Sequence, residues 1–367
     1  MNKLLFLLLS VMFTTTFSLA QVGPITGEAQ LRLSPIWVRV ADVYGEAGSV
    51  ESAEFSRDGK TIVTGTKFDN SVIMWRTSDG AELWRAYAAE EIERVAFSPD
   101  DKIVASVSED YLVTTYDAKT GEEIQRIELE SAADALVFAN KKNIMVVGQE
   151  EFEIKGEPDK GYIRAYNIDT GEMMYKVDHG ETVNEVQFTS DDKYFLSAGM
   201  NSEVRIWEAE TGKLVKTLSP DRDFGFVCGF FSPDSKYVAA SGFEGDIFLW
   251  DFETGELVRE WNTSGRKVET LAFTPDGNYL LSAGNDPYIR VYRMSQILDP
   301  IGKVPIAYAV HANDQAEYMD FNEDGSFLTS AHQDGTVRLW AFMGEDQGLN
   351  ARRHSEVKKG QTDAAKK

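Results

Sequence analysis

Apolar and polar residues alternate with a period of two along most of the chain, in short segments separated by turn residues. Val204–Trp207 and Val337–Trp340 show the pattern, with β-branched and aromatic side chains at alternate positions. This period and composition are typical of β-strands that are buried on one face. Asp and Gly stand between such segments, as in Arg57–Lys60 and Pro275–Asn278, where tight hairpin turns require them. The pattern therefore predicts an all-β chain of short antiparallel hairpins.

The hairpin pattern recurs seven times. Each unit has a first strand ending in Phe, a turn, a second strand of small residues and a third strand ending in Trp or Tyr. The repeated phenylalanines are spaced by 41 to 50 residues, a period that indicates a repeat architecture; they are Phe55, Phe97, Phe138, Phe188, Phe231, Phe273 and Phe321. A Thr-Gly turn, such as Thr254-Gly255, then leads into a further segment. Each unit is therefore predicted to contain four strands.

Particular motifs carry a family resemblance. Phe-Ser-Pro-Asp occurs at residues 97–100 and 231–234, and the third strand of the fifth unit ends in Trp250-Asp251. With these motifs and its period, the chain resembles the WD-repeat β-propellers over roughly residues 31 to 343. The resemblance implies a seven-bladed β-propeller with four antiparallel strands per blade. Because this fold serves many tasks, the resemblance alone assigns no function.

The resemblance also implies a polar chain of His, Ser or Thr, Asp and an aromatic residue, hydrogen-bonded across the strands of one blade. Two units match this pattern well, and the fourth has Asn in the place of Asp. The matching residues are His311, Ser330, Asp334 and Trp340 in the last unit, and His179, Ser197, Asn201 and Trp207 in the fourth. The other units keep only part of the pattern.

The two ends of the repeat region predict how the ring closes. After Trp340 there is too little strand-like sequence for a fourth strand, whereas a strand-like segment, Pro35–Val40, precedes the first unit. We expect this segment to complete the last blade, which would protect an otherwise unpaired edge. The propeller domain is then predicted over residues 21–343, and the polar, basic segment 344–367 is expected to be disordered.

The first twenty residues have the features of a signal peptide. Lys3 is followed by the mostly apolar run Leu4–Phe13 and by Ser18–Ala20, a small-residue cleavage pattern before Gln21. The run of about ten residues is short of the roughly 20 that span a membrane as a helix. Cys228 is the only cysteine, which leaves no internal disulfide and no site for lipidation after the apolar run. We expect a secreted or periplasmic monomer without membrane insertion.

Charge and motif content bear on function. Without residues 1–20 the chain has 36 basic and 60 acidic residues, a net charge of −24, which disfavours nucleic acid as a partner. The sequence contains no nucleophile elbow, paired cysteines, zinc-protease motif or EF-hand calcium loop, so neither cofactor nor metal is expected. We therefore expect a protein-binding scaffold without catalysis. Two alternatives stay open: a propeller enzyme such as a lactonase or quinone-dependent dehydrogenase, and a sensor or inhibitor module of an envelope complex.

Candidate partner-binding residues are those that a blade does not need for its own fold. The resemblance implies that the residue before each turn Asp is a contact residue, and Phe68, Met200 and Phe243 are large and apolar there. Phe224 from a neighbouring loop would enlarge the patch, unless these side chains pack against adjacent loops. The insertion of the third unit carries Phe152 and Ile154 among acidic residues. It would present them to a partner or form a solvated hairpin.

Overall fold

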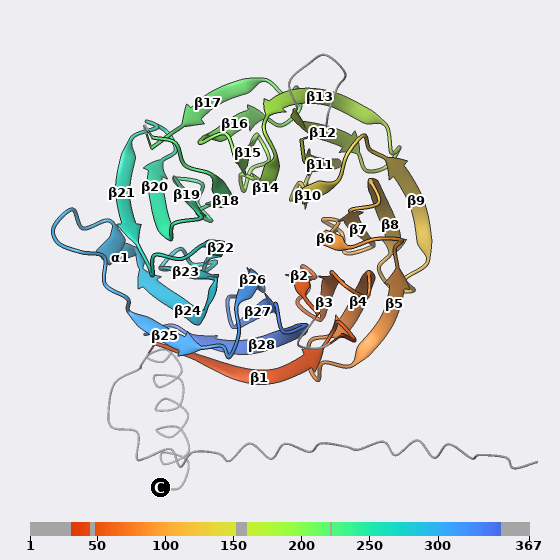
Figure 1. Cartoon of the computed structure of the whole chain (residues 1–367), viewed down its shortest axis with the longest axis horizontal. Helices are drawn as coiled ribbons and strands as arrows, with labels where there is room; N and C mark the ends of the chain where they lie inside the picture. The colour runs from red at the N-terminus through yellow and green to blue at the C-terminus, as the bar shows by residue number, and fades with distance from the viewer. Residues whose placement is uncertain (1–30, 45–47, 152–159, 221, 346–367) are drawn as a thin grey trace, which may run out of the picture. The chain divides into compact units, whose positions relative to one another are not determined.

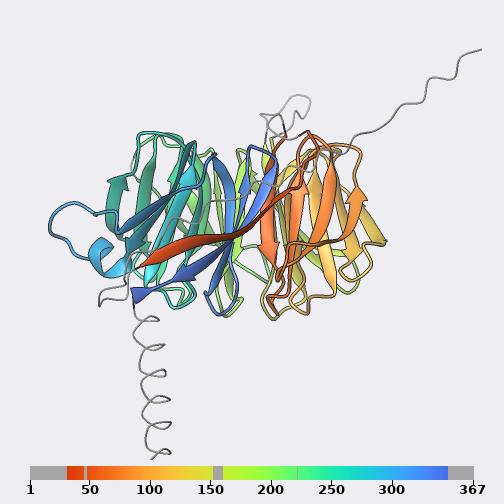
Figure 2. The same cartoon turned by 90° about the horizontal axis from the view of Figure 1, so that it is seen from below.

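The computed structural model describes residues 31–44, 48–151, 160–220 and 222–345. In this part of the chain, seven four-stranded antiparallel sheets form a ring (Figure 1). Seen from the side, the strands of each sheet run from one face of the ring to the other (Figure 2). The prediction of an all-β, seven-bladed propeller is confirmed.

The blades follow the chain in order, each with its first strand innermost. Blades 1 to 3 are formed by β2 (Val50–Phe55), β3 (Thr61–Thr66), β4 (Ser71–Arg76) and β5 (Glu82–Tyr87); β6 (Ile92–Phe97), β7 (Ile103–Ser108), β8 (Leu112–Asp117) and β9 (Glu123–Glu128); and β10 (Ala133–Phe138), β11 (Ile144–Gln149), β12 (Gly161–Asn167) and β13 (Met173–Gly180). Blades 4 and 5 are formed by β14 (Val183–Phe188), β15 (Tyr194–Gly199), β16 (Val204–Glu208) and β17 (Leu214–Leu218); and β18 (Phe226–Phe231), β19 (Tyr237–Gly242), β20 (Asp246–Asp251) and β21 (Leu257–Asn262). Blade 6 contains β22 (Val268–Phe273), β23 (Tyr279–Gly284), β24 (Asp286–Arg293) and β25 (Tyr308–His311), with the short helix α1 (Met294–Ile297) after β24; blade 7 contains β26 (Ala316–Phe321), β27 (Phe327–His332), β28 (Thr336–Met343) and β1 (Arg32–Val40).

The first hairpin of a blade is a tight turn held by its own side chains. In blade 1, Asp58 Oδ1 accepts hydrogen bonds from Ser56 Oγ at 2.9 Å and from the Lys60 amide at 3.0 Å. The next residue, Gly59, has a φ of +67°, a conformation that glycine adopts without steric cost. The equivalent residues of five other blades also have positive φ; they are Asp101, Asp192, Ser235, Gly277 and Gly325.

The core lies between neighbouring blades. At the junction of blades 7 and 1, Ala331 and Val337 from blade 7 pack with Val50, Phe55 and Trp75 from blade 1. All five side chains are buried, and burying one large apolar side chain stabilises a fold by about 1.5–3 kcal/mol. Each blade thus depends on its neighbours for its apolar contacts.

Successive connections alternate between the two faces because the strands of each blade are antiparallel. We call the face that carries the connections between second and third strands, such as Lys67–Asn70, the loop face. The opposite face carries both hairpins of each blade, such as Ser56–Lys60, and is called the hairpin face. The insertion of the third unit, between β11 and β12, leaves from the loop face, and residues 152–159 lie outside the described part of the chain.

The N-terminal strand β1 closes the ring. It pairs antiparallel with β28, and Val40 lies opposite Thr336 at the end of the ladder. The predicted closing strand, Pro35–Val40, is therefore confirmed, and it begins three residues earlier, at Arg32. Blade 7 thus takes three strands from the end of the repeat region and one from its beginning (Figure 1).

Side chains of β1 also bind blade 1. Trp37 Nε1 donates a hydrogen bond to the Thr77 carbonyl at 2.8 Å, and Arg39 Nε donates to the Gly80 carbonyl at 2.8 Å. Gly80 has a φ of +64°, and a Cβ there would lie 2.9 Å from Trp37 Cδ2. β1 therefore joins blade 7 by strand pairing and blade 1 by side-chain contacts.

Tryptophan and serine are hydrogen-bonded inside two blades. In blade 7, Trp340 Nε1 donates to Ser330 Oγ at 2.8 Å, and His332 Nε2 lies 2.7 Å from the same oxygen. In blade 4, Trp207 Nε1 donates to Ser197 Oγ at 2.8 Å. These contacts tie the second strand of the blade to the third.

One of the two predicted histidines lies apart from its predicted partners. His311 lies exposed at the end of β25 in blade 6, with its ring against Tyr288. The expectation for His311 was therefore wrong, because the histidine that contacts Ser330 comes from the end of β27, as His332. His179 is buried and its Nδ1 lies 2.9 Å from the Glu181 carbonyl.

The acidic member of the predicted chain is also bound elsewhere. Asp334, in the connection between β27 and β28, accepts hydrogen bonds from Thr336 and Arg338. It does not link His311 to Trp340, which corrects the expectation. In blade 4, Asn201 Nδ2 donates to the His179 carbonyl at 3.1 Å. Asp334 and Asn201 therefore hold the loops of their blades.

Ring closure predicts a difference between two truncations. Deleting residues 31–41 removes the fourth strand of blade 7 and should lower the melting temperature of the whole propeller, whereas deleting 346–367 leaves every described contact of β1 in place. Trp37→Ala should destabilise by about 3–5 kcal/mol, and Ile36→Ala, at an exposed position of the same strand, by about 0.5 kcal/mol or less. Thermal melts of the four variants provide the measurement. A tail deletion more damaging than the strand deletion would contradict the closure.

The polar contacts of blade 7 predict a second difference. Ser330→Ala leaves Trp340 Nε1 and His332 Nε2 without their shared partner inside the blade, and should cost about 1–3 kcal/mol. His311→Ala changes an exposed side chain and should shift stability by about 0.5 kcal/mol or less. Urea denaturation of both variants tests this, and equal stability of the two would argue against the polar link.

Candidate functional site

Acidic side chains surround the axis of the ring on the loop face. They occupy the second residue of the inner strand, which is Glu51, Glu93, Asp134, Glu269 or Glu317 in five blades and Asn184 or Val227 in the other two. All are half-buried. We call these five acids the acidic ring. They were not among the residues predicted for the site, although the signal is in the sequence: each stands four residues before a repeated phenylalanine.

Burial and mutual repulsion change the ionisation of these acids. Burial, followed by the charge of Glu51, raises the pKa of Glu93 to about 8. Burial, followed by the charge of Glu150, raises the pKa of Asp134 to about 7. For Glu317, burial and then the charge of Glu269 act in the same direction. These three acids of the ring therefore keep their protons to a higher pH than exposed carboxyl groups do, because each is half-buried beside other acids.

Two lysines partly neutralise the acidic ring. Lys67 Nζ lies 2.8 Å from Glu91 and 3.6 Å from Glu93, and Lys267 Nζ lies 2.8 Å from Glu269. Glu109, Asp134 and Glu150 offer carboxylate oxygens within 4.8 Å of one another. Their geometry would allow a cation, but clustered acids alone do not identify an ion site.

Three predicted apolar residues are exposed beside these charges. Phe68 is 50% exposed and Phe243 46% exposed, and Met200 is also exposed. Lys67 precedes Phe68 in the chain, and Lys267 Nζ lies 5.1 Å from the centroid of the Phe243 ring. Phe243 therefore lies next to a cation that contacts the acidic ring.

The structure brings two of these three residues together. A Cβ placed on Gly225 would lie 3.1 Å from Met200 Cε and 3.2 Å from Phe243 Cε2. The two side chains therefore both lie beside Gly225, in the connection between blades 4 and 5. Phe68 belongs to blade 1, which packs against blades 7 and 2. The loop face thus has an apolar pair on one side of the ring and a single phenylalanine on another.

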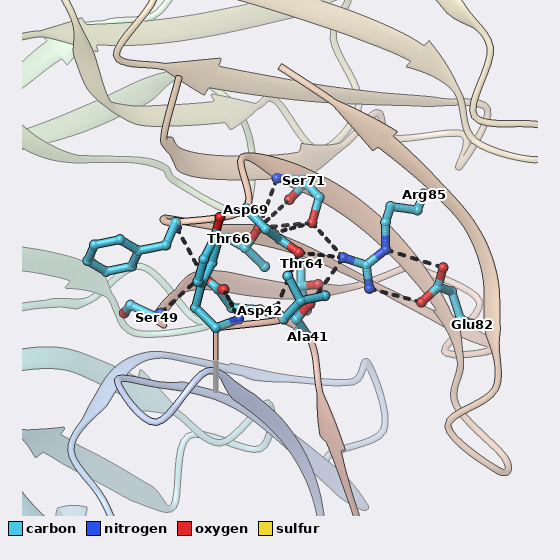
Figure 3. Close-up of polar contacts among 12 residues, drawn as sticks. Ala41, Asp42, Ser49, Thr64, Thr66, Asp69, Ser71, Glu82 and Arg85 are labelled. Carbon is cyan, nitrogen blue, oxygen red and sulfur yellow. Dashed lines mark hydrogen bonds and ion pairs between the residues drawn. The ribbon is translucent and has the colours of Figure 1, made fainter. Parts of the chain in front are cut away.

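A polar cluster holds the loop of Phe68 in place (Figure 3). Asp42 Oδ2 accepts hydrogen bonds from the amides of Phe68 at 2.9 Å and Ser49 at 3.3 Å. Arg85 Nη1 donates to Asp69 Oδ2 at 2.8 Å and to the Ala41 carbonyl at 3.1 Å. Because these residues follow β1 or lie in blade 1, ring closure also orders the loop that exposes Phe68.

The remaining predicted contact residues have different outcomes. Phe224 is only 6% exposed, and its ring centroid lies 5.1 Å from that of Phe226 and 5.0 Å from that of Phe248. The prediction of an exposed Phe224 was wrong, because an aromatic cluster of blade 5 encloses it. Phe152 and Ile154 lie outside the described residues.

Two histidines and the cysteine, side-chain types that often act in catalysis, have pKa values far from neutral pH. Burial lowers the pKa of His179 to about 4 and that of His332 well below its usual value. Burial raises the pKa of the Cys228 thiol to about 12, and its sulfur contacts Ser241 Oγ at 3.0 Å. These buried groups serve the core of their blades.

Among the described residues, no helix is both long enough and apolar enough to cross a bilayer.

Two protein families match different parts of the chain. The family described as "WD domain, G-beta repeat" matches residues 171–208, 212–251, 255–293 and 308–341. The family described as "Outer membrane protein assembly factor BamB" matches residues 34–152. The matched WD40 repeats thus lie in the second half of the region over which the resemblance was predicted.

Curated relatives are distant and match in part. Eukaryotic translation initiation factor 3 subunit I of Vanderwaltozyma polyspora is 24% identical over 202 residues, which are 52% of this chain and 58% of that protein. The same subunit of Eremothecium gossypii is 26% identical over 194 residues, 50% of this chain and 56% of that protein. The serine-threonine kinase receptor-associated protein of Gallus gallus is 23% identical over 186 residues, 49% of each chain.

The chain therefore spans about half the length of the curated relatives it matches. The four family matches and the seven four-stranded sheets agree with the resemblance drawn from the sequence motifs. The chain is a seven-bladed β-propeller, and four of its segments between residues 171 and 341 match the WD40 repeat family.

Proposed function

We propose that the chain is an exported, protein-binding scaffold whose loop face binds a protein or peptide partner. The observation that carries the proposal is the combination on this face of an acidic ring with the exposed side chains Phe68, Met200 and Phe243. Exposed apolar side chains beside strong charge are typical of a surface that another molecule covers. The names of the relatives, a subunit and a receptor-associated protein, support an interaction role.

The partner is expected to carry basic groups next to apolar ones. Basic groups would be attracted by the acidic ring, which speeds association and selects the orientation of the partner. Apolar groups would contact Phe68 or the pair of Met200 and Phe243. The loop of Phe68 is already held by Asp42 and Asp69, so little conformational entropy is lost there on binding.

Catalysis is the alternative function. A propeller enzyme requires convergent groups of suitable ionisation, but the buried His179, His332 and Cys228 have pKa values moved away from neutrality. These three groups therefore do not support acid–base or nucleophilic catalysis of the lactonase or quinone-dependent dehydrogenase kind.

Partner binding is tested by substitution of the exposed side chains. Phe68→Ser, Met200→Ser and Phe243→Ser together should abolish affinity capture of the partner from extracts of the source organism, because large side chains at an interface contribute most of its binding energy. Each change should shift stability by about 0.5 kcal/mol or less. Capture should also weaken at high salt, because salt screens exposed charges.

A matched control uses exposed apolar residues on the outer strands. Ile124→Ser, Leu214→Ser and Leu257→Ser remove comparable side chains and should leave capture unchanged. Intact capture by the loop-face variant, or equal loss in the control, would place the binding surface elsewhere. Unfolding of the loop-face variant would show that its side chains belong to the core.

Export is tested by the mature N-terminus. If residues 1–20 are a signal peptide, mass spectrometry of the protein purified from its source should find a chain that begins at Gln21, in the periplasm or the medium. An intact Met1 in the cell interior would contradict the export part of the proposal.

A further inference from the structure

A chamber of about 480 Å³ occupies the hairpin-face end of the ring axis. Inner strands of all seven blades and first hairpins of six line it, and the seven repeated phenylalanines are among the lining residues. Its position is opposite to the loop face, so it is separate from the site proposed above. The chamber is a candidate for a second ligand.

Contacts across the axis lie on the loop-face side of this chamber. Arg94 of blade 2 reaches Glu185 of blade 4, with 3.3 Å between Nη2 and Oε2. The same guanidinium lies 4.4 Å from the ring centroid of Tyr318 in blade 7, a favourable cation–π geometry. Three blades are thus joined across the axis, and Arg94 is already engaged with its own counter-charge.

Two acids in the chamber hydrogen-bond the next blade. Glu54 Oε1 accepts from the Phe97 amide at 3.0 Å, and Asp320 Oδ2 accepts from the Phe55 amide at 2.8 Å. Gln187 of blade 4 makes the same contact to the Phe231 amide. A neutral amide therefore suffices to link two blades, and the carboxyl groups of Glu54 and Asp320 provide a charge that this link does not require.

The ionised forms of Glu54 and Asp320 are unfavourable in the chamber. Burial, followed by the charge of Asp320, raises the pKa of Glu54 to about 8, and burial raises the pKa of Asp320 to about 7. Arg57 is the only Lys or Arg among the described residues that line the chamber, against five acids: Glu54, Asp101, Glu185, Asp320 and Glu323. Two half-buried carboxyl groups without a dedicated cation are the arrangement that a positively charged ligand would complete.

The walls between the charges are apolar. Val137, Phe230 and Ala272 occupy on their inner strands the position that Glu54 and Asp320 occupy on theirs, one residue before the repeated phenylalanine. A ligand that contacts both kinds of side chain needs a charged end and an apolar stem.

We propose that this chamber binds an organic cation, an ammonium or guanidinium group on an apolar stem, with Glu54 and Asp320 as its counter-charges. The cation donates hydrogen bonds to the carboxylate oxygens that do not accept from the backbone, and the stem lies against Phe230 and its neighbours. The group belongs either to a free small molecule or to a side chain of another protein.

Calorimetric titration with n-butylguanidinium tests the proposal. It should bind at least about tenfold more tightly than the neutral isostere n-butylurea, a free-energy difference of about 1.4 kcal/mol. Glu54→Gln with Asp320→Asn should reduce the affinity for n-butylguanidinium to that for n-butylurea. The control variant Glu122→Gln with Glu256→Gln has the same change of net charge in exposed turns and should keep the parent affinity.

The affinity for n-butylguanidinium should also rise between pH 6 and 8.5, because the ligand binds the ionised carboxylates and burial holds them partly protonated at lower pH. Several other titratable groups face Glu54 and Asp320. They are Arg94, Asp101, Glu185 and Tyr318, together with Arg57 and Glu323 of the first hairpins. Of these, Arg94 and Glu185 are paired with each other.

A peptide distinguishes the two sources of the cation. Binding of acetyl-Gly-Arg-Gly-amide as tight as that of n-butylguanidinium indicates a protein side chain, and binding of n-butylguanidinium alone indicates a free small molecule. Absence of binding by both probes would overturn the proposal, as would undiminished binding by the double variant. Thermal melts show whether the double variant folds. If it does not, the single variant Asp320→Asn is used, because its side-chain oxygen can still accept the hydrogen bond from the Phe55 amide.

Discussion

The pairing of β1 with β28 is the constraint on which the rest of the structure depends. Blade 7 has only three strands after residue 311, so the ring stays open unless the strand at the beginning of the repeat region supplies the fourth. β1 also binds the Gly80 turn of blade 1, and the residues that follow it hold the loop of Phe68 through Asp42. One strand thus joins the first and last blades and orders part of the loop face.

Closure matters because each proposed site is assembled from several blades. The acidic ring takes one residue from each of five inner strands, and the chamber on the hairpin face is lined by all seven. The same strands serve both sites. On β2, Glu51 of the acidic ring lies four residues before the repeated Phe55, and Glu54, which links two blades, lies one residue before it. A change in the relative position of the blades would disperse both sets of side chains.

Periodicity along the sequence predicted the strands, the seven units and the closing strand, because each depends on a local pattern of apolar and turn residues. Contacts between units carry no such pattern. His332 takes the place expected for His311 because it stands two residues after Ser330 on β27, where alternate side chains point to the same face of the sheet. Phe224 lies in a connection without periodicity, and only the arrangement of Phe226 and Phe248 around it shows that it is buried. The acids of the acidic ring recur in the sequence four residues before the repeated phenylalanines, but only the arrangement of the inner strands around one axis brings them together.

Hydrogen–deuterium exchange of the full chain tests the central claim, ring closure by β1, most directly. The hydrogen-bonded amides of β1 should exchange as slowly as those of β28, because the strand leaves the sheet only when the ring opens. Its exchange should accelerate together with that of the Phe68 loop when Trp37 is replaced by Ala. Rapid exchange throughout β1 beside a protected β28 would contradict the account, since the ring would then persist without its closing strand.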